Sequence, residues 1–139
     1  MNRTGPDTAR YPELTYNAVE LGREVAAMAT KKLTPTERES AALDCDRALV
    51  AFQFKPSPWE IDVLTARVHG QGVRLYASVQ ALPGTRRADA ALRDWAGLMT
   101  TGPEPIPLGR WTYLRALART VRVFLEVLDA ADAAKDGAR

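Results

Sequence analysis

The chain has one cysteine and one histidine in 139 residues, and this scarcity excludes several kinds of site. Cys45 has no second cysteine to pair with, which is typical of a protein from a reducing compartment. A structural zinc site takes about four ligands, mostly Cys and His, and a di-iron site in a helical bundle needs a Glu-x-x-His motif from each of two helices. The sequence therefore predicts neither a metal nor another cofactor.

Long apolar runs are also missing. No stretch approaches the about 18 apolar residues that suggest a membrane span, and the N-terminus lacks the apolar segment of a signal peptide. The glycine-rich motifs GxxxxGK[ST] and GxGxxG, which hold nucleotide phosphates, are absent as well. We therefore expect a cytoplasmic protein with no membrane association, and the net charge of only +2 gives no general reason to expect nucleic acid as a partner.

What the chain does have is helical periodicity. Between positions 110 and 134, apolar residues recur every three or four positions, as on one face of a helix. They are Leu114, Leu117, Ala118, Val121, Phe124, Leu125, Leu128 and Ala131. A strand would alternate at every second residue, so this segment predicts a long helix that is buried against other helices.

Two capping signals predict where other helices begin. Thr34-Pro35-x-Glu37 and Ser57-Pro58-x-Glu60 each place a hydroxyl, a proline and a glutamate at the spacing of a helix N-terminus. The helices that follow are expected to reach about positions 53 and 82, with further helices at 12–32 and 87–99. The sequence thus predicts an all-α fold, a single-domain antiparallel bundle of about five helices, three of them long, over 12–134. We expect a flexible arm at 1–11 and a frayed end at 135–139.

The apolar sides of the two middle helices are specific expectations. For the helix after Thr34 they comprise Leu43, Ala48, Leu49, Phe52 and Phe54. For the helix after Ser57 they form a seam of Ile61, Leu64, Val68, Gly72, Leu75, Val79 and Leu82. Gly72 lies on that seam, which indicates a close helix crossing, and a kink near His69-Gly70 is the alternative.

Arginine gathers in the second half of the chain. Residues 67–122 carry nine arginines against three acidic residues, Asp89, Asp94 and Glu104. Arg115, Arg119 and Arg122 recur at i, i+4 and i+7 on the last helix, just after Arg110, so they project from one side. Arginine suits phosphate and carboxylate recognition, so this stripe is a candidate contact for an anion, a nucleic acid or a partner. The alternative is that acidic side chains of other helices neutralise it, and no helix-turn-helix signature supports DNA binding.

The aromatic residues offer a second candidate site. Trp59 and Trp111 each fall in the first turn of an expected helix, and together with Trp95 and His69 they are candidates for a pocket or an interface. The alternative is that the tryptophans close the ends of the core and that His69 is a surface or packing residue, because a general base needs a positioned partner. We assign no catalytic residue.

The segment GRWTYLRALARTVRVFLEVLDA contains an aromatic residue followed by Leu117, Ala118, Arg119, Val121, Arg122 and Leu125. This pattern resembles the end of small actinobacterial (Streptomyces-type) helical proteins of a family of unknown function, which are often labelled as natural-product biosynthesis proteins. The resemblance covers the last helix only and carries over no catalytic residue. It implies a soluble bacterial helical protein encoded in an accessory or secondary-metabolism region.

The function that follows is a non-enzymatic helical interaction or regulatory protein, which we expect to form a homo-oligomer or to bind a protein partner. Long amphipathic helices and the absence of a catalytic constellation favour it. A nucleic-acid-binding regulator that uses Arg110, Arg115, Arg119 and Arg122, together with Arg86 and Arg87, is one alternative. The other is a small-molecule binder or cofactor-free enzyme with a pocket near the tryptophans.

Overall fold

The computed structural model describes residues 31–137, and these residues contain helices and no strand. Four α-helices follow in order: α2 (Pro35–Ala48), α3 (Pro58–Gln80), α4 (Arg86–Thr101) and α5 (Gly109–Gly137), with a short 3-10 helix, η1 (Phe52–Phe54), between α2 and α3. The all-α class is confirmed. The described part has four helices where about five were expected for the whole chain, and both the expected arm at 1–11 and nearly all of the expected helix 12–32 lie outside it.

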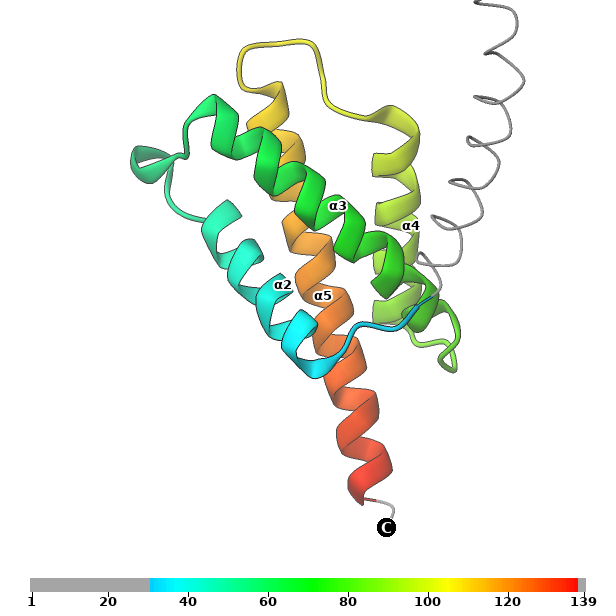
Figure 1. Ribbon diagram of the computed structural model, residues 1–139. Coiled ribbons are helices and arrows are strands. Elements are labelled where there is room, and N and C mark those ends of the chain that lie inside the picture. Colours follow the sequence, from blue (N-terminus) through cyan, green and yellow to red (C-terminus); the bar gives the residue numbers. More distant parts are fainter. Residues whose placement is uncertain (1–30, 138–139) are drawn as a thin grey trace, which may run out of the picture. The chain divides into compact units, whose positions relative to one another are not determined.

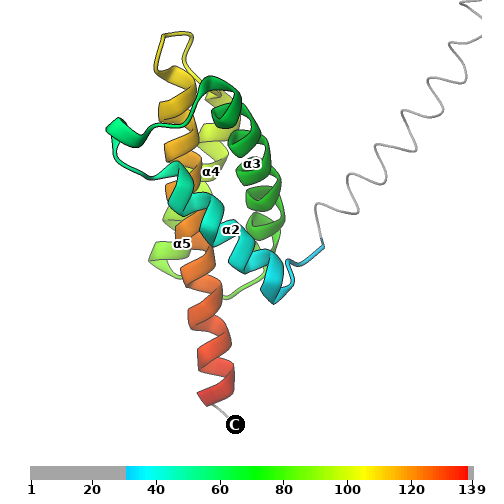
Figure 2. The ribbon, with the colours of Figure 1, turned by 60° about the vertical axis from the view of Figure 1, so that its left-hand side comes forward.

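Helix α5 is the centre of the bundle. It packs against α2, α3 and α4, and its last turns extend past the other three (Figures 1 and 2). The apolar stripe predicted for this helix is buried from Leu114 to Leu128, and Ala131 is half-buried where the helix leaves the bundle. Phe124, Leu114 and Leu117 are among the largest fully buried side chains, so the core lies along α5.

Local capping chemistry begins each of the first three helices. The Thr34 hydroxyl accepts the Glu37 N–H at 3.1 Å and the Glu37 carboxylate accepts the Thr34 N–H at 2.8 Å, which completes the predicted capping box. Ser57 likewise accepts the N–H of Glu60 at 3.2 Å, but the Glu60 carboxylate binds another partner. Thr85, which was not predicted as a cap, accepts the N–H of Ala88 and so caps α4.

The buried seam of α3 is confirmed from Ile61 to Val79, while Leu82 lies half-buried after the helix has ended at Gln80. The close crossing expected at Gly72 is also present. A Cβ built on Gly72 would lie only 2.0 Å from the Trp95 ring, so α4 approaches α3 through the space that a side chain would fill. Helix α3 is continuous through His69 and Gly70.

The second helix differs from expectation in its end and in its apolar side. Helix α2 ends at Ala48 rather than near 53, and Leu43, Phe52 and Phe54 are 67%, 63% and 62% exposed. The face that α2 buries is made of the small residues Ala41, Cys45 and Ala48 together with Asp44, whose carboxylate accepts hydrogen bonds from α3. Leu43 lies two residues from both Ala41 and Cys45, about 200° around the helix, so burying the small face turns Leu43 to solvent.

No helix of the described residues is long and apolar enough to cross a membrane. Among these residues, too, no three His, Cys, Asp or Glu side chains converge in a way that would hold a metal ion.

Candidate interaction surface

The arginine stripe of α5 is largely engaged with the neighbouring helices. Arg110 forms an ion pair with Asp62 of α3, and the Arg122 Nη2 lies 2.6 Å from a carboxylate oxygen of Asp46 on α2. These acidic residues are partly exposed, so each pair contributes little stability, but each occupies a guanidinium that a nucleic acid would otherwise contact. The arrangement favours the interpretation in which acidic residues of other helices neutralise the stripe.

Arg115 has a different role, because its partners are backbone carbonyls. Its Nη1 donates to the Val50 oxygen at 2.7 Å and to the Ala48 oxygen at 3.3 Å, and its guanidinium lies 5.1 Å from the Trp111 ring centroid. Carbonyls at the end of a helix have no partner within the helix and carry partial negative charge, which arginine satisfies. Arg115 therefore caps the end of α2 and ties it to α5.

Arg119 is the exception within the stripe. It is exposed, and within residues 31–137 it makes no hydrogen bond or ion pair. It lines a surface groove of about 610 Å³ between α4 and α5, together with Ala91, Arg93, Asp94, Gly97, Leu98, Thr101, Ala116, Thr120 and Val123. This groove has an apolar floor and a few charged groups, but no tryptophan.

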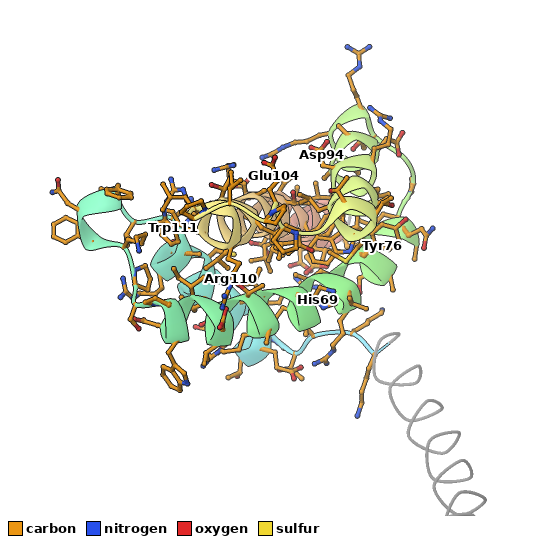
Figure 3. All side chains as sticks on the ribbon, turned by 90° about the horizontal axis from the view of Figure 1, so that it is seen from above. His69, Tyr76, Asp94, Glu104, Arg110 and Trp111 are labelled. Atoms are coloured by element: carbon orange, nitrogen blue, oxygen red, sulfur yellow. The ribbon has the colours of Figure 1, made fainter. Side chains whose placement is uncertain are left out.

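The three tryptophans and His69 do not form one pocket. Trp95 and Trp111 are buried, whereas Trp59 is 74% exposed. Trp95 belongs to the core, with the ring centroids of Phe124 and His69 5.9 and 6.0 Å away, and it also lines a surface groove of about 310 Å³ between α3 and α4 that holds neither of the other tryptophans. Figure 3 shows His69 on α3, well apart from Trp111 at the start of α5. His69 is exposed and contacts the Trp95 ring, which gives it no partner of the kind that a general base requires.

Instead, large exposed apolar side chains occur on three consecutive elements of the chain, α2, η1 and α3. We call Leu43, Phe52, Phe54 and Trp59 the apolar corner; all four are more than 60% exposed. Figure 1 shows this end of the bundle, with η1 projecting between the end of α2 and the start of α3. Trp59 was a candidate from its place in the sequence, whereas the other three were expected on the apolar side of the second helix.

The apolar corner is held by Arg47. Its Nε and Nη2 donate to the two carboxylate oxygens of Glu60 at 2.8 and 3.0 Å, and its Nη1 donates to the Phe54 carbonyl at 3.3 Å. A paired guanidinium–carboxylate contact fixes orientation as well as distance. One side chain of α2 therefore fixes both η1 and the first turn of α3, so the corner is presented by a braced segment.

The exposure of Trp59 could have been predicted from helical spacing. Trp111 precedes Leu114 by three residues and so shares its buried face. Trp59 precedes Ile61 by two residues, which places it on the opposite side of α3 from the seam. The exposure of Phe52 and Phe54 could not be predicted in this way, because it results from the end of α2 at Ala48, before either residue.

Residues 39–133 match a family of unknown function, DUF6415. The chain belongs to this family. The match begins within α2 and ends within α5, so it takes in all four described helices, where the resemblance seen in the sequence covered the last helix alone. No curated protein and no solved structure matches the chain.

Proposed function

We propose that this DUF6415 protein is a non-enzymatic helical interaction protein, whose role is to bind a protein surface and, first of all, a second copy of itself. The observation that carries this proposal is the apolar corner, with exposures of 62–74%. Three of its four side chains are aromatic, and aromatic residues are enriched in protein interfaces, so their exposure favours a surface that a partner covers. The bracing by Arg47 supports the same view, because a surface that is already ordered loses little entropy on binding.

The molar mass in solution tests the proposal. Light scattering over a concentration series up to tens of micromolar, at low and at physiological salt, should reveal a dimer or a larger assembly. An apolar contact should persist as salt rises, whereas an assembly held by surface ion pairs should weaken. A monomer at every concentration that also captures no protein partner in a pull-down would contradict the proposal.

A second candidate function, nucleic-acid binding, is favoured by one observation. Arg86, Arg93 and Arg119 on α4 and α5 are exposed and make no hydrogen bond or ion pair within the described part of the chain. Three free guanidinium groups form a much smaller footprint than the stripe predicted from sequence, since Arg110, Arg115 and Arg122 are engaged. A gel shift at low salt that fades steeply as salt rises would support this function, and no shift at low salt would dispose of it.

The actinobacterial, secondary-metabolism setting implied by the resemblance remains part of the proposal. An interaction protein in such a setting would act on the products of neighbouring genes. Co-purification of the tagged protein from its host should therefore recover proteins encoded beside it, and recovery of unrelated proteins alone would remove this part of the proposal.

A further inference from the structure

Helix α3 has two apolar faces, and the bundle buries only one of them along its full length. The inner face is the buried seam from Ile61 to Val79. On the opposite face, apolar or small residues recur at intervals of four, three, four, three and four positions. We call this set the outer stripe; it consists of Trp59, Val63, Ala66, Gly70, Val73 and Ala77. Such spacing is that of the contact positions in a coiled coil.

Most of the outer stripe is open on the described part of the molecule, whereas Val73, at its edge toward α4, packs against the core beside Trp95. Trp59, Ala66 and Gly70 are exposed, and Val63, Val73 and Ala77 are half-buried. Figures 1 and 3 show α3 on the outside of the bundle, with α5 behind it. No atom lies within 4 Å of a Cβ built on Gly70, so the backbone there is accessible to close approach. The solvent face of a bundle helix is normally polar, which makes this face unusual.

The charged residues of α3 lie beside the outer stripe and are engaged within the chain. Glu60 binds Arg47, Asp62 binds Arg110, and Arg67 donates to Asp44 at 3.1 Å. An apolar surface flanked by charges that already have partners can be covered without leaving an unpaired charge at its edge.

We propose that the outer stripe is the docking surface for the same helix of a second copy of this chain, in antiparallel orientation. This inference rests on the proposed self-association and names the surface that mediates it. A single two-fold axis near position 68 pairs residues equally distant from that position. Ala66 then lies opposite Gly70, Val63 opposite Val73, and Trp59 opposite Ala77, so that the surface is self-complementary.

Side-chain size selects the antiparallel orientation. Each large Trp59 side chain covers the small Ala77 of the other copy, and the Ala66–Gly70 pairs let the two backbones approach closely at the centre. A parallel pair would set Trp59 against Trp59 at one end and Gly70 against Gly70 farther along, leaving a void that costs contact energy.

Trp59 is the largest single contribution to the surface that the outer stripe exposes. An aromatic side chain buries roughly 150–250 Å². At its exposure of 74%, Trp59 offers on the order of 150 Å² per copy. Standard interfaces bury about 800 Å² per partner, so the rest of the stripe and the flanks of α3 must supply most of the area.

Two matched variants test the surface. Ala66→Arg places a charge at the centre of the outer stripe, and Ala42→Arg places the same charge on an exposed helical alanine of α2 that lines the opposite, α5-facing groove. Ala66→Arg should raise the dimer dissociation constant at least about thirty-fold, a change on the scale of an interface hot spot, with an unchanged far-UV circular dichroism spectrum. Ala42→Arg should dimerise like the wild type.

The outcomes separate this inference from the proposed function. If the wild type forms a dimer and Ala66→Arg forms it equally well, the outer stripe is not the interface. The proposal that the protein self-associates would then still stand. A wild type that stays monomeric at every concentration and captures no partner would overturn both.

Cysteine cross-linking tests the orientation. Val63→Cys mixed with Val73→Cys should give a covalent heterodimer under mild oxidation, since the two positions face each other in the antiparallel pair. Val63→Cys alone should not cross-link, because two copies of position 63 lie about 15 Å apart along the helix axis. Efficient cross-linking of Val63→Cys with itself would indicate a parallel pair and contradict the inference. The native Cys45 is fully buried and should not compete.

Discussion

Replacing Gly72 with alanine tests the packing at the centre of the bundle. A Cβ at this position would lie 2.0 Å from Cη2, 2.5 Å from Cζ3 and 2.7 Å from Cζ2 of the Trp95 ring. Trp95 is 3% exposed and its ring lies against Phe124 and His69, so it cannot move away from α3 without disturbing these contacts. The substitution therefore forces α3 and α4 apart or drives the ring from its rotamer, and either change is destabilising.

The magnitude is the difference between two opposing effects. Alanine is favoured over glycine in a helix interior by about 1 kcal/mol. Overpacking a filled core costs about 1–3 kcal/mol and occasionally more, and an overlap with three ring atoms belongs at the upper end of that range. We expect Gly72→Ala to lower the free energy of unfolding by about 2 kcal/mol in total.

Gly70→Ala is the matched control, two residues away on the same helix. No atom lies within 4 Å of its Cβ position, so this variant gains the helix propensity without the clash and should be more stable by up to about 1 kcal/mol. Because the propensity gain is common to both variants, the difference between them isolates the overpacking cost, which we expect to be about 3 kcal/mol.

Urea unfolding followed by circular dichroism measures both variants. Gly70 belongs to the outer stripe, so the measurement is made at concentrations where the protein is monomeric. Equal m-values would show that unfolding exposes the same amount of surface in each variant. A Gly72→Ala variant as stable as Gly70→Ala would refute the reasoning, because it would mean that the Trp95 ring does not lie against α3 at Gly72.

Three further predictions follow from single side chains. Hydrogen bonds from Arg74, and then from the backbone of Thr34, hold the pKa of Glu37 below its usual 4.5, so the ionised carboxylate stabilises the fold above pH 4.5 and that stability is lost as pH falls through the lowered pKa. Acid titrations of unfolding should show the wild type losing this increment and Glu37→Gln losing none. Burial raises the pKa of Cys45 to about 12, so a thiol reagent at neutral pH should react only when denaturant is added, and rapid reaction of the native protein would contradict this. Leu117→Ala should cost about 2–5 kcal/mol in thermal or urea unfolding because Leu117 is fully buried, whereas Leu43→Ala should stay within about 0.5 kcal/mol; equal losses would show that the two leucines are placed wrongly.

Features governed by local chemistry could be predicted from the sequence. The starts of α2 and α3 follow from the Thr34 and Ser57 caps, whose partners lie three residues away. The buried face of α5 follows from the period of its apolar residues, because one long stripe admits one inward face. The close crossing at Gly72 was predictable too, since a glycine on an apolar seam leaves room that a neighbour fills.

The buried face of α2 could not be predicted in the same way. Ranked by hydrophobicity, Leu43 belongs in the core before Ala41, Cys45 or Ala48. In the bundle, the small residues face inward because α2 approaches both α3 and α5 closely, and that requirement comes from the neighbouring helices rather than from α2 itself. Its weak amphipathicity left the choice of face to tertiary packing.

Whether each arginine of α5 is paired within the chain or free to bind a partner also depends on tertiary contacts. The sequence places Arg110, Arg115 and Arg122 on one side of α5, but their partners Asp62, Val50 and Asp46 come from α3, from the segment after α2, and from α2 itself. Helical spacing predicts where a side chain projects, not which helix packs beside it. An arginine-rich face can therefore be a binding surface or an internal brace, and only the neighbouring helices decide between the two.

This distinction bears directly on which surface is available for recognition. A nucleic acid that recruited Arg115 or Arg122 would first have to break contacts that hold α2 against α5, and the helix end at Ala48 would lose its cap. A protein that covers Trp59 and the outer stripe breaks no contact seen in the described residues and removes apolar surface from water. The described part of the bundle thus pairs most of its charged groups internally and leaves apolar side chains exposed, which is why we propose a second helix, rather than a polyanion, as its partner.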